Sequence, residues 1–163
     1  MTRIRRVTPE DLPRVRAFWR ERWGDEFVVA HGVTYRPEGL DGYVIEEREE
    51  WVGLVTLAFA DDECEIVSID SLREGTGIGT QLIEKAAEAA RARDCRRLYL
   101  ITTNDNLRAL AFYQKRGFEL AALHRGAMER ARRIKPSIPL IGENGIPLRD
   151  EIELEMSLRG APR

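Results

Sequence analysis

Cysteine and histidine are scarce in this sequence, and neither occurs in a metal-binding or disulfide pattern. The 163 residues include two cysteines and two histidines. Cys64 and Cys95 lie far apart without a Cys-x-x-Cys spacing, which argues against structural zinc and against a disulfide framework. We therefore expect no metal, and we expect both thiols to pack in the interior rather than to act as nucleophiles.

Long apolar runs and an excess of positive charge are also lacking. No segment approaches the roughly 20 apolar residues of a membrane span, and no apolar signal-peptide core follows the basic N-terminal residues. With 26 Lys and Arg against 28 Asp and Glu, the net charge of −2 creates no global field for nucleic acid or anionic membranes. We expect a cytoplasmic protein with neither as a partner.

The length and composition are those of one globular domain. Of the 163 residues, 43% are hydrophobic and 33% are charged, a balance that excludes intrinsic disorder. A chain of this length buries a sizeable core without disulfides. We expect residues 1–163 to form a single domain.

Hydrophobic periodicity predicts the order of the secondary-structure elements. Strands are predicted over residues 3–7, 43–47, 50–59, 64–72, 97–103, 118–124 and 152–158. Helices are predicted over residues 9–23, from residue 78 into 91–95, and over 107–115. Antiparallel strands followed by alternating helices and strands predict an α/β fold with a mixed, mostly antiparallel central sheet and helices on both faces.

Two regions give weaker patterns. Residues 27–43 are broken by glycine and proline, and they predict an irregular region with room for one strand, where substrate-side loops lie. Prolines and glycines between the basic stretch 125–135 and the acidic stretch 143–155 predict a loop there. We interpret the basic stretch 125–135 as a solvated helix face, with a partner surface or a lid over CoA phosphates as the alternatives.

Glycines alternate in the segment Gly75-Thr76-Gly77-Ile78-Gly79-Thr80, between a predicted strand and a long predicted helix. Glycines there permit a tight turn and let a ligand approach the free N–H groups of the first helical turn, where the helix dipole favours an anion. The segment lacks both the lysine of a Walker A loop and the spacing of a dinucleotide motif. It predicts a phosphate or pyrophosphate site; the alternative is a glycine-rich helix start that only permits close packing.

This segment resembles the acetyl-CoA-binding motif of the GNAT superfamily of N-acetyltransferases, Gln/Arg-x-x-Gly-x-Gly/Ala at the start of a long helix. Gly77-Ile78-Gly79 matches the second half of the motif. The Gln/Arg position is occupied by Glu74, whose carboxylate is unfavourable beside a pyrophosphate unless it points away.

A second block of residues is similar to the other signature of this family, Asn-x-x-Ala-x-x-x-Tyr followed by Gly-Phe. It comprises Asn106, Ala109, Tyr113 and Gly117-Phe118, one helix and one strand downstream of the glycine segment. The alternative is a helix that Asn106 caps and whose Tyr113 packs in the core. The two blocks and the order of the elements extend the resemblance to nearly the whole chain.

The resemblance implies a GNAT-like fold and acetyl transfer from acetyl-CoA to an amine, directly within a ternary complex. It implies acetyl-CoA contacts from the backbone of residues 69–72, with the N–H of Leu72 polarising the acetyl carbonyl. Tyr113 is implied as proton donor to the leaving thiolate and Glu65 as general base, with Asp70 as its competitor. The other implied acetyl-CoA-binding residues are Gly75, Gly77, Ile78, Gly79, Thr80 and Asn106.

Other functions and partners remain open at this point. One alternative is a catalytically silent CoA-binding regulatory module, and another is a nucleic-acid-binding domain that uses the basic residues 125–135. The acceptor is a small-molecule or peptide amine, and the final apolar strand leaves room for a homodimer. We expect a cationic acceptor to meet Asp150, Glu151 and Glu153, unless these carboxylates pair with the basic stretch.

Overall fold

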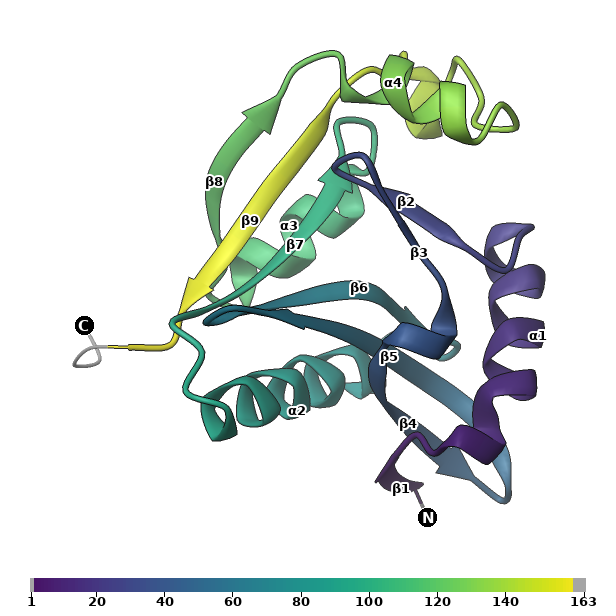
Figure 1. Cartoon of the computed structure of the whole chain (residues 1–163), viewed down its shortest axis with the longest axis vertical. Coiled ribbons are helices and arrows are strands. Elements are labelled where there is room, and N and C mark those ends of the chain that lie inside the picture. The colour runs from purple at the N-terminus through teal and green to yellow at the C-terminus, as the bar shows by residue number, and fades with distance from the viewer. Residues whose placement is uncertain (1, 160–163) are drawn as a thin grey trace.

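The computed structural model describes residues 2–159 and shows a seven-stranded sheet with helices on both faces (Figure 1). In spatial order, the strands are β1 (Thr2–Arg6), β4 (Asp41–Glu47), β5 (Glu50–Ala60), β6 (Glu63–Ser71), β7 (Arg97–Thr103), β9 (Glu151–Ser157) and β8 (Glu119–His124). Neighbouring strands are antiparallel except β6 and β7, which run parallel. The predicted mixed, mostly antiparallel sheet is confirmed.

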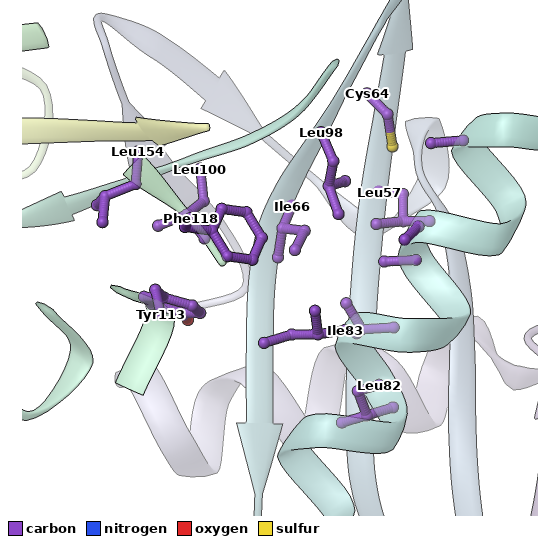
Figure 2. Close-up of a cluster of buried hydrophobic side chains, with 14 of the residues drawn as sticks. Leu57, Cys64, Ile66, Leu82, Ile83, Leu98, Leu100, Tyr113, Phe118 and Leu154 are labelled. Atoms are coloured by element: carbon purple, nitrogen blue, oxygen red, sulfur yellow. The ribbon is translucent and has the colours of Figure 1, made fainter. Parts of the chain in front are cut away.

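Side chains that alternate along β5 separate two apolar layers, one on each face of the sheet. The helices are α1 (Leu12–Trp23), α2 (Ile78–Ala92), α3 (Leu107–Lys115) and α4 (Ala127–Ile134). Leu54 packs in a cluster with Trp19 of α1, whereas Val55 packs in a second cluster with Leu82 of α2 and Tyr113 of α3. Figure 2 shows the second cluster, with α2 against the strands. The sheet therefore has α1 on one face and α2 and α3 on the other.

Strands β6 and β7 pair over only part of their length. Residues Glu63–Ile66 lie in register with Arg97–Leu100, and beyond this stretch the two strands diverge (Figure 1). Their unpaired edges therefore face a gap, in which backbone groups remain available for a ligand.

A bulge in β6 changes which side chains share a face. The β5 residues Thr56 and Leu57 pair with Ser68 and Ile66, so Val67 is the extra residue between them.

Because of this extra residue, Glu65 and Asp70 lie on the same face of the sheet although they are five positions apart. Their partners on β5 are Ala58 and Leu54, which are four positions apart and therefore share a face. That face is the one that α1 covers, since Leu54 packs against α1.

Residues 27–43 contain more regular structure than the sequence predicted. Strands β2 (Val28–Ala30) and β3 (Val33–Tyr35) form an antiparallel hairpin, joined by His31 and Gly32 with φ values of 40° and 79°. Two consecutive left-handed residues are what a tight two-residue hairpin turn requires. The prediction of room for one strand was therefore too low.

Residues 127–134 form helix α4, in agreement with the interpretation of the basic stretch as a helix, but only one side of this helix is solvated. Met128 and Ala131 are buried against Leu148, while Arg130 and Arg133 are exposed. The helix contacts β2, so it lies beside the hairpin (Figure 1).

The two cysteines are buried in the described part of the chain and are not bonded to each other. Burial raises the pKa of the Cys64 thiol to about 12, which keeps it protonated near neutral pH. Within residues 2–159, no helix has the length and apolar character to cross a membrane. The same residues contain no cluster of three or more His, Cys, Asp or Glu side chains that could hold a metal.

Candidate active site

A cavity of about 670 Å³ lies where β6 and β7 diverge, bounded by the glycine segment at the start of α2 and by α3. Predicted site residues that line it are Gly75, Gly77, Ile78, Gly79, Thr80, Asn106 and Tyr113, together with Asp70. Leu72 and Glu65 are not among its lining residues. The cavity therefore brings together both blocks of residues that the sequence singled out.

The glycine segment presents free backbone N–H groups to this cavity. Gly75 and Gly77 have φ values of 73° and 80°, and a Cβ atom on either would meet nothing within 4 Å. Helix α2 begins at Ile78, so the N–H groups of its first turn have no partner within the helix. The turn is thus open to an anion, which the helix dipole also favours.

Gly79 has a different role, because it permits α3 to lie against α2. A Cβ atom on Gly79 would lie 2.8 Å from Cζ of Phe112. The guanidinium of Arg116 stacks on this ring, 3.6 Å from its centroid, and its Nε donates to Oγ1 of Thr80 at 2.8 Å. Sequence reasoning missed Phe112 and Arg116, which are four residues apart, with Arg116 directly after the last residue of the predicted helix.

The cavity wall is rich in positive charge. Its cationic lining residues are Arg73, Arg108, Lys115 and Arg116. Glu74 is turned toward α3, where its Oε1 lies 2.9 Å from Nη1 of Arg108. Both side chains of this ion pair are largely exposed, so the pair is weak and can exchange for contacts with phosphate.

The backbone of β6 presents Ile69 and Ser71 to the gap, rather than Leu72. The N–H of Leu72 donates to the carbonyl oxygen of Val52 at 2.9 Å, so it is not free to polarise a ligand. Hydrogen-bonded and non-hydrogen-bonded residues alternate in an antiparallel pair. The N–H groups of Ser71 and Ile69 therefore point away from β5, toward the gap.

Tyr113 is buried on α3 with its side chain at the cavity wall. Its ring packs edge-to-face against Phe112 and Phe118 at centroid distances of 5.3 and 5.6 Å. Burial raises the pKa of its hydroxyl, and the charge of Asp70 raises it further. The hydroxyl is thus protonated at neutral pH and available as a proton donor.

Asp70 is a buried carboxylate at the same cavity. Its side chain is 7% exposed, and its Oδ2 is buried without a hydrogen-bond partner among residues 2–159. Its Oδ1 lies 3.5 Å from Nε of Arg22, on the last turn of α1. Burial raises the pKa of Asp70, while Arg22 and Trp23 oppose this increase. A carboxylate of this kind accepts a proton more readily than a solvated one.

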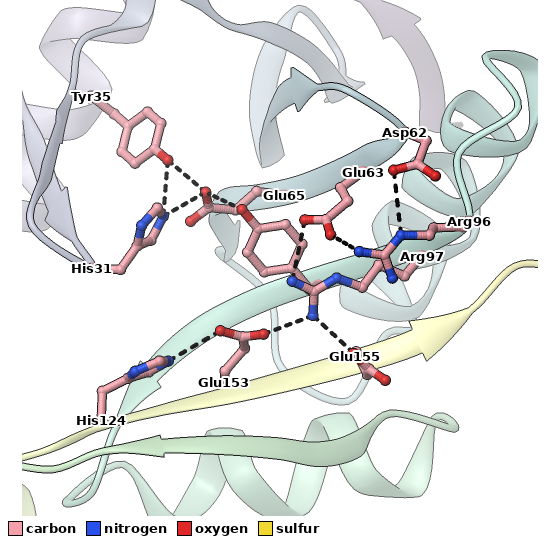
Figure 3. A network of polar contacts seen from close by, with 11 residues as sticks. His31, Tyr35, Asp62, Glu63, Glu65, Arg96, Arg97, His124, Glu153 and Glu155 are labelled. Atoms are coloured by element: carbon pink, nitrogen blue, oxygen red, sulfur yellow. Dashed lines mark hydrogen bonds and ion pairs between the residues drawn. The ribbon is translucent and has the colours of Figure 1, made fainter.

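Glu65 lies outside the cavity, in a polar cluster beneath the β2–β3 hairpin (Figure 3). Its side chain is 2% exposed, and its Oε1 accepts hydrogen bonds from Tyr35 at 2.6 Å and Tyr99 at 3.1 Å. The Nε2 atom of His31 lies 2.9 Å from the same oxygen. Glu65 thus holds the hairpin against the sheet, through contacts that no sequence pattern indicates.

The acidic residues near the C-terminus have partners within the protein. Asp150 accepts from the N–H of Gly126 at 2.8 Å, and Glu151 accepts from the N–H of His31 at 3.1 Å. Glu153 accepts from Arg97 at 2.7 Å and lies 3.1 Å from His124. None of the three lines the cavity, and their partners include no side chain of the basic stretch 125–135 among the described residues.

Comparisons with known proteins agree with this fold. A family model described as "Acetyltransferase (GNAT) family" matches residues 6–118. The chain is 49% identical over 152 residues to the uncharacterized protein YxbD of Bacillus subtilis (strain 168), covering 93% of this chain and 94% of that protein. The chain therefore belongs to the GNAT acetyltransferase family, which confirms the resemblance.

Solved structures of acetyltransferases share the fold. An IAA acetyltransferase from Bacillus cereus ATCC 14579 is similar at a TM-score of 0.70 and 24% identity, covering 96% of this chain and 99% of that chain. A GNAT family acetyltransferase from Elizabethkingia anophelis with acetyl-CoA bound is similar at a TM-score of 0.70 and 23% identity, covering 96% and 97%.

Proposed function

We propose that this protein transfers an acetyl group from acetyl-CoA to an amine, directly within a ternary complex. The observation that carries the proposal is one continuous cavity that joins the glycine segment to Tyr113 and Asp70. An anion site, a proton donor and a carboxylate thus line the same space. These are the groups that acetyl transfer from a thioester to an amine requires.

The residues present fit acetyl-CoA. The first-turn N–H groups of α2 and the cationic side chains on the cavity wall suit its phosphates. The free edge of β6 suits its extended pantetheine arm, which would hydrogen-bond to the backbone like an added strand. The acetyl-CoA bound to the similar Elizabethkingia anophelis protein supports this choice of ligand.

The cavity residues divide the chemistry between them. Asp70 accepts a proton from the ammonium form of the acceptor, and the neutral amine nitrogen then forms a bond to the acetyl carbonyl carbon. One of the two N–H groups on the free edge of β6, that of Ile69 or that of Ser71, donates to the oxyanion that develops there. When the carbon–sulfur bond breaks, Tyr113 donates its proton to the thiolate, and the resulting phenolate takes the remaining extra proton from the acceptor nitrogen, which leaves a neutral amide and free CoA. We favour Asp70 over Glu65 as the base, because Asp70 lines the cavity and Glu65 does not.

Titration calorimetry with acetyl-CoA, followed by an assay of free CoA release with a panel of amines, tests this function. We expect binding and amine-dependent release of CoA, and we expect Gly77→Val to weaken binding by obstructing the turn. Binding without release for any amine would instead identify a catalytically silent CoA-binding module. Absence of binding by the folded wild-type protein would refute both.

A further inference from the structure

We propose that the acceptor is a free amino acid, whose ammonium group binds Asp70 and whose carboxylate binds Arg22. The inference rests on the proposed function and names the class of acceptor. It is carried by three neighbouring side chains, Arg22, Trp23 and Asp70, where α1 ends beside β6.

Asp70 supplies the site for the ammonium group. It lines the cavity, and only 7% of its side chain is exposed. Its Oδ2 atom has no hydrogen-bond partner among the described residues. A buried carboxylate oxygen without a hydrogen bond is costly unless a ligand satisfies it. An ammonium group of the acceptor would supply that hydrogen bond at the place where its proton must leave.

Arg22 supplies the site for a carboxylate. Its Nε lies 3.5 Å from Oδ1 of Asp70, at the outer limit of a hydrogen bond, and its side chain is 43% exposed. Among residues 2–159, this is the single ion pair that Arg22 forms. The two Nη atoms are therefore available for a bidentate contact, the geometry that guanidinium groups form with carboxylates.

The charge of the Arg22–Asp70 pair distinguishes between acceptors. The cation beside Asp70 weakens the attraction of that carboxylate for a simple alkylammonium, which would have to approach Arg22 as well. An amino acid carries its ammonium group and its carboxylate on the same α-carbon, so the ammonium can face Asp70 while the carboxylate faces Arg22. The site is thus complementary to an amino acid rather than to a polyamine or another simple cation.

Trp23 supplies an apolar surface beside the charged pair. It lines the cavity, and its side chain is 47% exposed, which is unusual for a residue of this size. A half-exposed indole next to two charged groups suits the carbon side chain of an amino acid.

A matched series of acceptors tests the inference. For leucine and phenylalanine, the series contains the amino acid, its carboxamide and the amine left after removal of the carboxyl group. The assay measures release of free CoA, and it gives kcat/KM for each compound. We expect kcat/KM to be at least about tenfold higher for the amino acids, since a charge-assisted bidentate contact is lost in the other two.

Arg22→Gln and Arg20→Gln form the matched pair of variants. Both remove one positive charge from the last turn of α1, but Arg20 pairs with Glu26 at 3.7 Å and not with Asp70. We expect Arg22→Gln to lower kcat/KM for the amino acids about tenfold or more, with the decarboxylated amines unchanged or improved. Arg20→Gln should match the wild type on all compounds.

Several outcomes would overturn the inference while leaving the proposed function intact. One is a kcat/KM for the carboxamides that equals or exceeds that for the amino acids, which would favour a peptide N-terminus as the acceptor. The same result for the decarboxylated amines would favour a simple amine. Another is equal behaviour of the two arginine variants toward every compound. Binding of acetyl-CoA without acetylation of any amino acid would also overturn it. Failure of the proposed function itself would show as the absence of acetyl-CoA binding by calorimetry.

Discussion

The ring of Phe112 occupies the space that a side chain at Gly79 would need. A Cβ atom at Gly79 would lie 2.8 Å from the ring, whereas one at Gly77 would meet nothing within 4 Å but would require a φ of +80°. The two glycines thus serve different purposes within one motif. Gly77 turns the chain into α2, and Gly79 lets α3 lie against that helix.

This difference predicts that Gly79→Ala and Gly77→Ala both destabilise the protein, but for separable reasons. Overpacking against Phe112 should cost about 1–3 kcal/mol in the first case. The left-handed backbone should cost about 1–2 kcal/mol in the second. Replacing the ring by a smaller side chain in Phe112→Leu should relieve the overpacking in Gly79→Ala but not the backbone strain in Gly77→Ala. Urea denaturation of the single and double variants measures both.

The measured free energies of unfolding can contradict the packing role of Gly79 in two ways. The interpretation of Gly79 as a packing residue is wrong if Gly79→Ala unfolds at the same urea concentration as the wild type. It is also wrong if Phe112→Leu restores the two alanine variants to the same extent, because Gly77 does not contact that ring.

Tyr113→Phe should lower kcat about a hundredfold and leave the acetyl-CoA dissociation constant nearly unchanged. The lost hydroxyl serves the departing thiolate, which forms only as the carbon–sulfur bond breaks. Tyr99→Phe is the control, since it removes a partly buried hydroxyl that contacts Glu65 outside the cavity. Calorimetry and steady-state kinetics check both variants. A parallel loss of acetyl-CoA affinity in Tyr113→Phe would assign the hydroxyl to binding.

The choice between Asp70 and Glu65 as base predicts opposite results for two amide substitutions. The rate should rise with pH through the raised pKa of Asp70, because the deprotonated carboxylate accepts the proton. Asp70→Asn should abolish this acidic limb of the kcat/KM profile. Glu65→Gln should retain the limb and lose about 1–3 kcal/mol of stability, since it disturbs the partly buried hydrogen bonds that hold the hairpin. Loss of the limb in Glu65→Gln alone would return the role of base to Glu65.

The sequence could predict the parts of the site that depend on local pattern. The glycine segment and the Asn106–Tyr113 helix have spacings that stand on their own, and both blocks line one cavity. Alternating apolar residues were likewise enough to predict most strands.

The placement of Glu65 and Asp70 could not be predicted in this way. A regular strand would put residues five apart on opposite faces, and the bulge at Val67 puts them on the same face. That bulge has no reliable sequence signal.

Contacts between distant segments were equally hidden. The positions of Arg22 beside Asp70 and of His31 beside Glu65 depend on how α1 and the hairpin dock on the sheet. The positions of α1 and the hairpin on the sheet depend on packing across the whole apolar core, and no short sequence pattern predicts them.

The stability of the protein should decrease as the pH rises from the ordinary pKa of histidine, 6.5, through the raised pKa of His31. Its hydrogen bond to Glu65 raises the pKa of His31 above 6.5, and the charges of Glu151 and Glu153 add to this effect while burial opposes it. A group whose pKa is raised by folding stabilises the folded state below its unfolded pKa, and this stabilisation is lost as the pH passes the raised value. We therefore expect the free energy of unfolding to fall over that range.

His31→Asn should remove this dependence, and it is the suitable substitution because asparagine tolerates the left-handed backbone at this position. His124→Asn is the matched control, since His124 lies beside Glu153 but does not contact the hairpin. Urea denaturation from pH 6 to pH 9 measures the slope for the wild type and both variants. If His31→Asn keeps the slope of the wild type, or His124→Asn loses it, the pH dependence does not arise from the contact between His31 and Glu65. Loss of the slope in His31→Asn alone would assign the pH dependence to the contact between His31 and Glu65.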